Sequence, residues 1–286
     1  MIDAVPSAEP IEWLKKQRLI RDGKPTVAGV LLFHEEPQVE VPKSAIKIYR
    51  YKTSDSAGTR ETLLSDPISI EGPLYEQIFS AVNTTVHMIE SISALGESGM
   101  ERVSYPKEAI HEIITNAVIH RDYSLPDDVH VRIFDNRIEV ESPGVLPSYV
   151  TVKNILSERA ARNPRIVRIL NKFRNPPNKD VGEGLNTAFE SMRSLRLRDP
   201  VVEQMDYSVR VTLKHEKLGT SEEQIVAFLQ ENDEINNSKA REICLIGSEN
   251  TVKRIFQKMI QSGVIERIPG RAQNKAAYRK GQKFPK

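Results

Sequence analysis

The residue types best suited to chemistry in this chain lie in one short segment, residues 108–123, where Glu112 and Asn116 are four positions apart. Residues four apart lie on one face of an α-helix, so we expect the carboxylate and the carboxamide to point the same way. A carboxylate can take a proton from water, and an amide oxygen can join the oxygen shell of Mg²⁺. The pair therefore suits nucleotide chemistry; the alternative is an ordinary amphipathic helix with a polar outer face.

The elements expected around this pair would hold it against a sheet. An apolar stripe along the segment predicts a helix that packs on strands, through Ile110, Ile113, Ile114, Ala117 and Val118. Two alternating stretches, residues 129–134 and 137–141, are joined by Asp135-Asn136 and predict a hairpin. A long connection over residues 148–180 follows, with a basic helix over 164–173.

Glycines mark the end of this connection. Gly182 and Gly184 precede a predicted helix that runs to about Leu195, and a last strand is expected over residues 207–213. Free backbone N–H groups and the helix dipole favour anions at such a helix start. A lone G-x-G is weak evidence, but its place after the Glu112–Asn116 helix and the hairpin favours a phosphate site.

The first region, up to about residue 97, is predicted to mix helices and strands. Its apolar spacing predicts helices over residues 11–20 and 74–95 and strands over residues 27–33 and 45–51, with a break at 96–99.

From Thr220 onward the pattern changes to three short helices followed by a two-stranded hairpin, which is the winged-helix order. Ser221 and Gln224 have capping-box spacing, and Ser248 begins the third helix. After residue 250 there are ten basic residues and one acidic residue. We expect duplex DNA to be bound by the outer face of the third helix and by the wing, through Asn250, Thr251, Arg254, Gln257, Lys258, Arg271 and Lys275. A winged helix used for protein contacts is the alternative.

Composition excludes several classes of protein. The 286 residues include 39% hydrophobic and 28% charged residues, as in a globular protein, and the single cysteine, Cys244, cannot form an internal disulfide. No apolar run reaches the roughly 18 residues of a membrane span, so we expect a cytoplasmic protein without membrane contact. The chain has no P-loop motif, and His120-Arg121-Asp122 lacks the other protein-kinase signatures.

Several of these segments resemble a known family. His111-Glu112 with Asn116 resembles the N box of the GHKL (Bergerat-fold) ATPases. Closer still, residues 112–123, Ser142-Pro-Gly144, Arg162-Asn-Pro164 and Gly182-Glu-Gly-Leu185 resemble the divergent "RecG C-terminal-like" ATP-binding branch. In that branch the ATP-binding domain commonly lies between a Schlafen-type AlbA domain and a winged helix. Residues 23–33 resemble the segment that joins the AlbA domain to the ATP-binding domain.

The resemblance implies roles for individual residues. Glu112 would polarise the attacking water, Asn116 would bind Mg²⁺, and residues 148–180 would form the lid over ATP. Further contacts to the nucleotide would come from Glu141, Ser142, Gly144, Arg162, Asn163, Gly182, Gly184 and Leu185. The family usually has D-x-G-x-G at the adenine, whereas residues 141–145 lack the aspartate and the second glycine. We therefore expect weak binding of an adenine nucleotide and slow or absent hydrolysis.

Together these features predict an α+β protein of three parts: a remnant AlbA-like region over residues 1–97, a GHKL-type α/β sandwich over 98–216 and a winged-helix domain over 219–286. The favoured function is a nucleotide-responsive, DNA-binding transcriptional regulator, expected to be a homodimer. The alternatives are an ATPase that acts on nucleic acid, a structural module with a degenerate site, and a Schlafen-like nuclease or defence effector.

Overall fold

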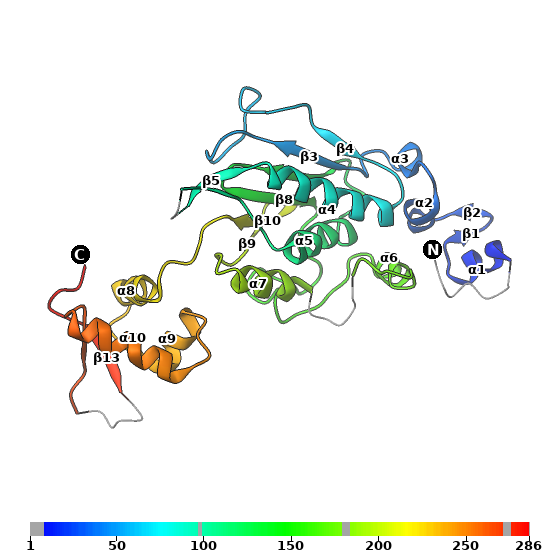
Figure 1. Ribbon diagram of the computed structural model, residues 1–286. Coiled ribbons are helices and arrows are strands. Elements are labelled where there is room, and N and C mark those ends of the chain that lie inside the picture. Colours follow the sequence, from blue (N-terminus) through cyan, green and yellow to red (C-terminus); the bar gives the residue numbers. More distant parts are fainter. Residues whose placement is uncertain (1–8, 97–98, 179–183, 271–275, 286) are drawn as a thin grey trace. The chain divides into compact units, whose positions relative to one another are not determined.

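The computed structural model describes residues 9–96, 99–178, 184–270 and 276–285. The chain forms two compact units, residues 1–216 and residues 217–286, and each has its own apolar core. Both units combine helices with sheets (Figure 1), so the predicted α+β class is confirmed. Among the described helices, none combines the length and the apolar character that crossing a bilayer requires.

The first unit is built on a six-stranded sheet that joins distant parts of the chain. In sheet order its strands are β4 (Ile68–Ile70), β3 (Ile46–Arg50), β7 (Val129–Ile133), β8 (Arg137–Pro143), β10 (Ser208–Lys214) and β9 (Val201–Gln204). Strands β3 and β7 are parallel, and the other neighbours are antiparallel. The hairpin predicted over residues 129–141 is confirmed by β7 and β8. The boundary expected near residue 97 lies within this unit, because β3 pairs with β7.

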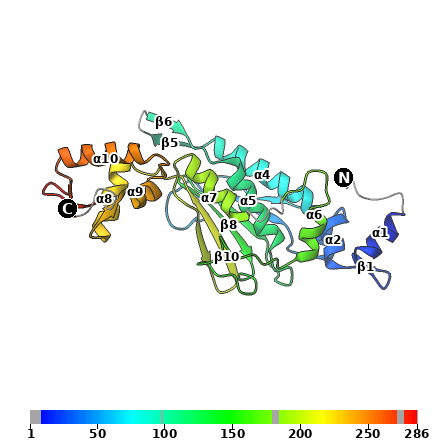
Figure 2. The ribbon, with the colours of Figure 1, turned by 90° about the horizontal axis from the view of Figure 1, so that it is seen from below.

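Helices cover one face of this sheet (Figures 1 and 2). They are α4 (Leu74–Glu90), α5 (Lys107–Ile119) and α7 (Gly184–Ser194), and α5 packs against α4, α7 and β8. Alternate strand residues such as Ile48, Val131 and Val140 are buried beneath the helices, as the period of two in a strand requires. The opposite face carries polar side chains. The fold is thus two-layered at the place where α5 presents Glu112 and Asn116.

The prediction of a strand over residues 27–33 was wrong, because these residues form helix α2 (Val27–Phe33). Thr26 caps the helix, with its hydroxyl accepting a hydrogen bond from the Gly29 N–H at 3.3 Å. A Cβ on Gly29 would lie 2.4 Å from the Leu19 carbonyl oxygen, so the helix packs closely on the preceding segment. A short apolar run does not by itself distinguish a buried strand from a buried helix.

Other boundaries in the first unit also differ from prediction. The first helix, α1, spans Pro10–Lys16 and is followed by the short strands β1 (Ile20–Arg21) and β2 (Lys24–Pro25) and by helix α3 (Pro37–Glu40). Helix α4 ends at Glu90 instead of Leu95, and β5 (Ser93–Gly96) then pairs with β6 (Gly99–Arg102). The basic helix α6 spans Pro164–Leu170. Strands β4 and β9 were not predicted; both are short and lie at the edges of the sheet.

The second unit has three helices and a small antiparallel sheet. In chain order its elements are α8 (Ser221–Glu231), β11 (Ile235–Asn236), α9 (Asn237–Ile243), α10 (Glu249–Gln261), β12 (Ile265–Arg267) and β13 (Ala277–Lys280). The capping box of α8 is formed by Thr220 and Glu223 instead of the predicted Ser221 and Gln224. Ser248 caps α10 as predicted. Val252, Phe256 and Met259 are buried, whereas Ile260 on the same helix is 39% exposed.

Candidate nucleotide site

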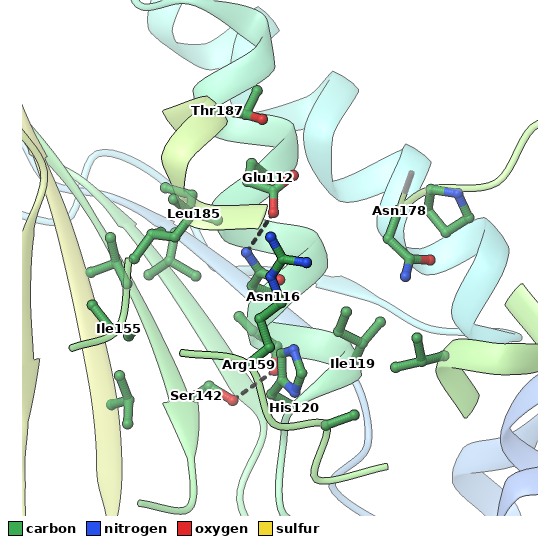
Figure 3. Close-up of a pocket in the computed structure, with 18 of the residues that line it drawn as sticks. Glu112, Asn116, Ile119, His120, Ser142, Ile155, Arg159, Asn178, Leu185 and Thr187 are labelled. Carbon is green, nitrogen blue, oxygen red and sulfur yellow. Dashed lines mark hydrogen bonds between the residues drawn. The ribbon is translucent and has the colours of Figure 1, made fainter. Parts of the chain in front are cut away.

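A cavity of about 750 Å³ lies in the first unit beside α5 (Figure 3). Its walls come from α5, from the ends of β8 and β10, from residues 175–178, from the start of α7, and from residues 145–161, which we call the cavity loop. Five residues of the predicted nucleotide site line it: Glu112, Asn116, Ser142, Gly144 and Leu185. Packing thus brings together three segments that are far apart in the sequence.

Glu112 and Asn116 form a hydrogen-bonded pair inside the cavity. The Asn116 Nδ2 donates to Glu112 Oε1 at 2.7 Å, one helical turn apart as the spacing predicts. The Asn116 amide oxygen is therefore left for another partner. Burial raises the pKa of Glu112, against the opposing effects of the Asn116 hydrogen bond and of nearby His111. A carboxylate with a raised pKa is the stronger base.

The end of β8 supplies the floor of the cavity through Ser142 and Gly144. The Ser142 hydroxyl donates to the Ala117 carbonyl oxygen of α5 at 2.6 Å. Gly144 has a φ of +105°, and a Cβ at this position would lie 2.7 Å from the Asp122 Cβ. Two backbone hydrogen bonds hold this turn, from Asp122 N to Pro143 O at 2.8 Å and from Gly144 N to Tyr207 O at 2.7 Å. Glycine is needed here for both conformation and space.

Glu141 does not line the cavity, because successive strand residues face opposite sides of a sheet. Its carboxylate accepts hydrogen bonds from Ser208 at 2.7 Å and from Arg132 at 2.6 Å, and it pairs with Arg210 at 3.1 Å. Burial acts to raise its pKa, but the hydrogen bonds from Ser208 and Arg132 and the arginine charges lower it to about 2. The side chain is thus engaged on the polar outer face.

Arg162 and Asn163 contact the protein itself near the cavity. Arg162 pairs with Asp122 at 3.1 Å and donates to the Val145 carbonyl oxygen. The Asn163 Nδ2 donates to the carbonyl oxygens of Ile119 and Arg121 at 2.9 and 2.8 Å. These contacts join the cavity loop to the end of α5, so both residues hold the wall of the cavity in place.

The start of α7 meets the cavity loop from the other side. Gly184 is the first residue of the helix, and Leu185 lines the cavity. The Asn186 Nδ2 donates to the Leu156 carbonyl oxygen at 3.1 Å, which ties the loop to α7. Gly182 lies outside the described residues.

The polar cavity residues that sequence reasoning missed include Arg159 and His120. The Arg159 side chain extends from the cavity loop toward Asn116 and Glu112 (Figure 3), and it forms no ion pair with any described residue. Nothing in its local sequence distinguishes it from other exposed cations. His120 could have been found, because Glu108, Glu112, Asn116 and His120 are each four residues apart and all line the cavity.

The structure places most of the predicted DNA-contacting residues on one helix of the second unit. Asn250, Thr251, Arg254, Gln257 and Lys258 are all exposed on α10. Lys258 pairs with Glu222 of α8 at 2.9 Å, whereas Arg254 forms no ion pair within the described part of the unit. Arg271 and Lys275 lie outside the described residues.

Comparisons with known proteins agree with the geometry of the first unit. The family model described as "Putative ATP-dependent DNA helicase recG C-terminal" matches residues 127–213, which begin after α5 and run from β7 through β10. No curated protein matches the chain. A crystal structure of the DIP2311 protein from Corynebacterium diphtheriae is similar, with a TM-score of 0.59 and 19% sequence identity, over 96% of this chain and 58% of that chain. The chain thus spans a little over half the length of that protein. This likeness concerns the fold alone. The family match supports an ATPase-type domain within the first unit and indicates nucleotide binding.

Proposed function

We propose that the first unit binds an adenine nucleotide with Mg²⁺ in the cavity beside α5, in the manner of a GHKL-type site. The observation that carries the proposal is the Glu112–Asn116 pair, which opens onto the same cavity as Ser142, Gly144 and Leu185. The match to an ATPase-type family over residues 127–213 supports it. The cavity volume of about 750 Å³ is in the range that holds small ligands.

The residues present fit a bound Mg²⁺ and a phosphate chain. Because the Asn116 Nδ2 is engaged with Glu112, its amide oxygen is free to join the oxygen shell of the ion. When bound, the ion would neutralise phosphate charge. Glu112 would orient a water molecule and accept its proton. Arg159, which extends toward this pair, would contact the phosphates (Figure 3).

Isothermal titration with Mg-ATP and Mg-ADP tests this proposal. We expect weak but Mg²⁺-dependent binding to the wild-type chain. Asn116→Ala should abolish the Mg²⁺ dependence of binding. Arg159→Ala should weaken the binding of ATP more than the binding of ADP. Asn136→Ala, in the turn between β7 and β8, is the matched control and should bind like the wild type. No binding by the wild-type chain at millimolar nucleotide would refute the proposal.

We further propose that the second unit is a winged helix that binds duplex DNA. The order α8, β11, α9, α10, β12, β13 is that of a winged helix, in which α10 would be the recognition helix. The exposed amides and cations of α10 suit base edges and phosphates. The complete chain would then be a DNA-binding regulator that responds to nucleotide, acting as a homodimer.

An ATPase that acts on nucleic acid is the second candidate, favoured by the raised pKa of Glu112 and by the family match. The two functions differ in turnover. A regulator should bind ATP and release it largely intact, whereas the enzyme should hydrolyse it faster when DNA is added. Phosphate release with and without duplex DNA separates them. Residues 1–97 would belong to an AlbA-like region in either case.

A further inference from the structure

His120 lies at one end of the polar stripe that α5 presents to the cavity. From Glu108 to His120 the stripe spans twelve residue-to-residue steps, or about 18 Å along a helix. Glu112 and Asn116 occupy its middle, and Thr187 lies beside Glu112 (Figure 3). His120 and Ser142 lie next to each other at the opposite end, beside Ile119 (Figure 3). If the phosphates lie near Asn116, this end is left for the base.

The polar atoms at this end form a defined pattern. The His120 Nδ1 is shut off from solvent and makes no hydrogen bond with the described residues, so Nε2 is the ring nitrogen that can meet a ligand. Burial and the charge of Arg162 lower the pKa of His120 to about 4, so the ring is neutral at pH 7. A neutral imidazole has one N–H. Placing it on Nε2 avoids a buried unpaired N–H and presents a donor to the cavity.

Ser142 presents a hydrogen-bond acceptor to the cavity, whereas His120 presents a donor. Its only hydrogen is donated to the Ala117 carbonyl oxygen at 2.6 Å, so toward the cavity the hydroxyl oxygen can only accept. A ligand edge that pairs with both residues must therefore carry a donor beside an acceptor. A 6-aminopurine has this arrangement in its amino group and its N1. In a 6-oxopurine the donor and the acceptor are exchanged, because O6 accepts and N1–H donates. An acceptor would then face the Ser142 oxygen and a donor would face the His120 N–H, so both contacts would oppose binding.

We propose that His120, acting as a hydrogen-bond donor beside the Ser142 acceptor, reads the edge of the nucleobase and makes the cavity select a 6-aminopurine over a 6-oxopurine. The inference rests on the proposed nucleotide site and adds the residue that sets its base preference.

The test compares the affinities of Mg-ATP and Mg-ITP, which differ at position 6 of the base, by isothermal titration at pH 7.5. The wild-type chain should prefer ATP by about tenfold, the size of one hydrogen bond made or lost. His120→Phe should bring the ratio close to one, and His120→Gln, which keeps a donor near Nε2, should restore part of it. His130→Phe is the matched control, since His130 lies on the outer face of the same sheet with Tyr49 and Asp127; its ratio should equal that of the wild type.

Thermal unfolding of the same variants separates recognition from structure. His120→Phe should not lower the melting temperature, because it removes a buried nitrogen that has no partner among the described residues. A purely structural histidine would show a lower melting temperature and an unchanged ratio, which would overturn the inference. An ATP-to-ITP ratio near one in the wild type would also overturn it and leave the proposed function standing. Absence of ATP binding would refute the proposed function itself, and this inference with it.

Discussion

Glu112 is held in the cavity at a cost to the stability of the folded chain. Among the described residues, its carboxylate accepts one hydrogen bond, from Asn116, while burial raises its pKa. When folding raises the pKa of a carboxyl group, the folded chain loses stability as the pH rises through the pKa that the group has in the folded state. At pH 7.5 the ionised form therefore destabilises the fold, which is expected where a residue is placed for chemistry instead of for packing.

Glu112→Gln should raise the melting temperature at pH 7.5, because the amide can still accept from Asn116 and carries no charge to bury. Nucleotide binding should persist, and any turnover should disappear. Differential scanning calorimetry and a phosphate-release assay measure the two effects. Glu108→Gln, one turn earlier and exposed, should leave the melting temperature unchanged. Brisk turnover by Glu112→Ala would exclude this carboxylate as the base.

His120 should make stability depend on pH in the acid range. Its pKa is lowered to about 4 by burial and by Arg162, compared with about 6.5 in an unfolded chain. Between these values the unfolded chain binds a proton that the folded chain does not, so stability falls as the pH falls from 6.5 to 4. The loss from this residue is up to about 3 kcal/mol. Urea unfolding across this range should show a flatter profile for His120→Phe, and equal profiles would contradict the assignment.

At the scale of elements, the turn between β8 and the cavity loop depends on Gly144. Gly144→Ala should destabilise the chain by roughly 2–5 kcal/mol, because the φ of +105° strains any Cβ and that atom would overlap Asp122. Gly23 is the control, since its φ is +75° and no atom of the described part of the chain lies within 4 Å of an added Cβ. Gly23→Ala should cost only about 1–2 kcal/mol of strain. The midpoints of denaturant unfolding compare the two variants. Equal losses of stability would show that the contact with Asp122 adds nothing to the cost of the strained backbone.

At the scale of the whole molecule, the second unit should account for DNA binding. If Arg254, Lys258, Arg271 and Lys275 meet phosphates, the logarithm of the binding constant should fall with the logarithm of salt at a slope near −3.6, at ~0.9 per contact. Fluorescence anisotropy with the complete chain measures this slope. Arg271→Ala should weaken binding to all DNA sequences alike, whereas Gln257→Ala should mainly reduce the preference for one DNA sequence over another. Lys24→Ala, in the first unit, should change neither. If no salt-sensitive DNA binding is found at low ionic strength, the unit would instead be a protein-contact module.

Much of the fold followed from patterns that are local in the chain. The hairpin of β7 and β8 was predicted from its alternation and its turn, and α10 was predicted from its spacing and its start at Ser248. The strand predicted over residues 27–33 was wrong, since an apolar run of that length fits either element until its neighbours are known. The edge strands β4 and β9 were missed because each is only three or four residues long.

The sequence alone determined the pairing of Glu112 with Asn116, because the geometry of one helical turn sets the direction of both side chains. Tertiary structure decided which distant residues share their cavity. It placed Ser142 inside and Glu141 on the outer face, since only the packing of α5 on the sheet shows which face of β8 is covered. It also brought Arg159 of the cavity loop toward Asn116 (Figure 3). Spacing sets directions within an element, whereas contacts between elements depend on how their apolar faces pack.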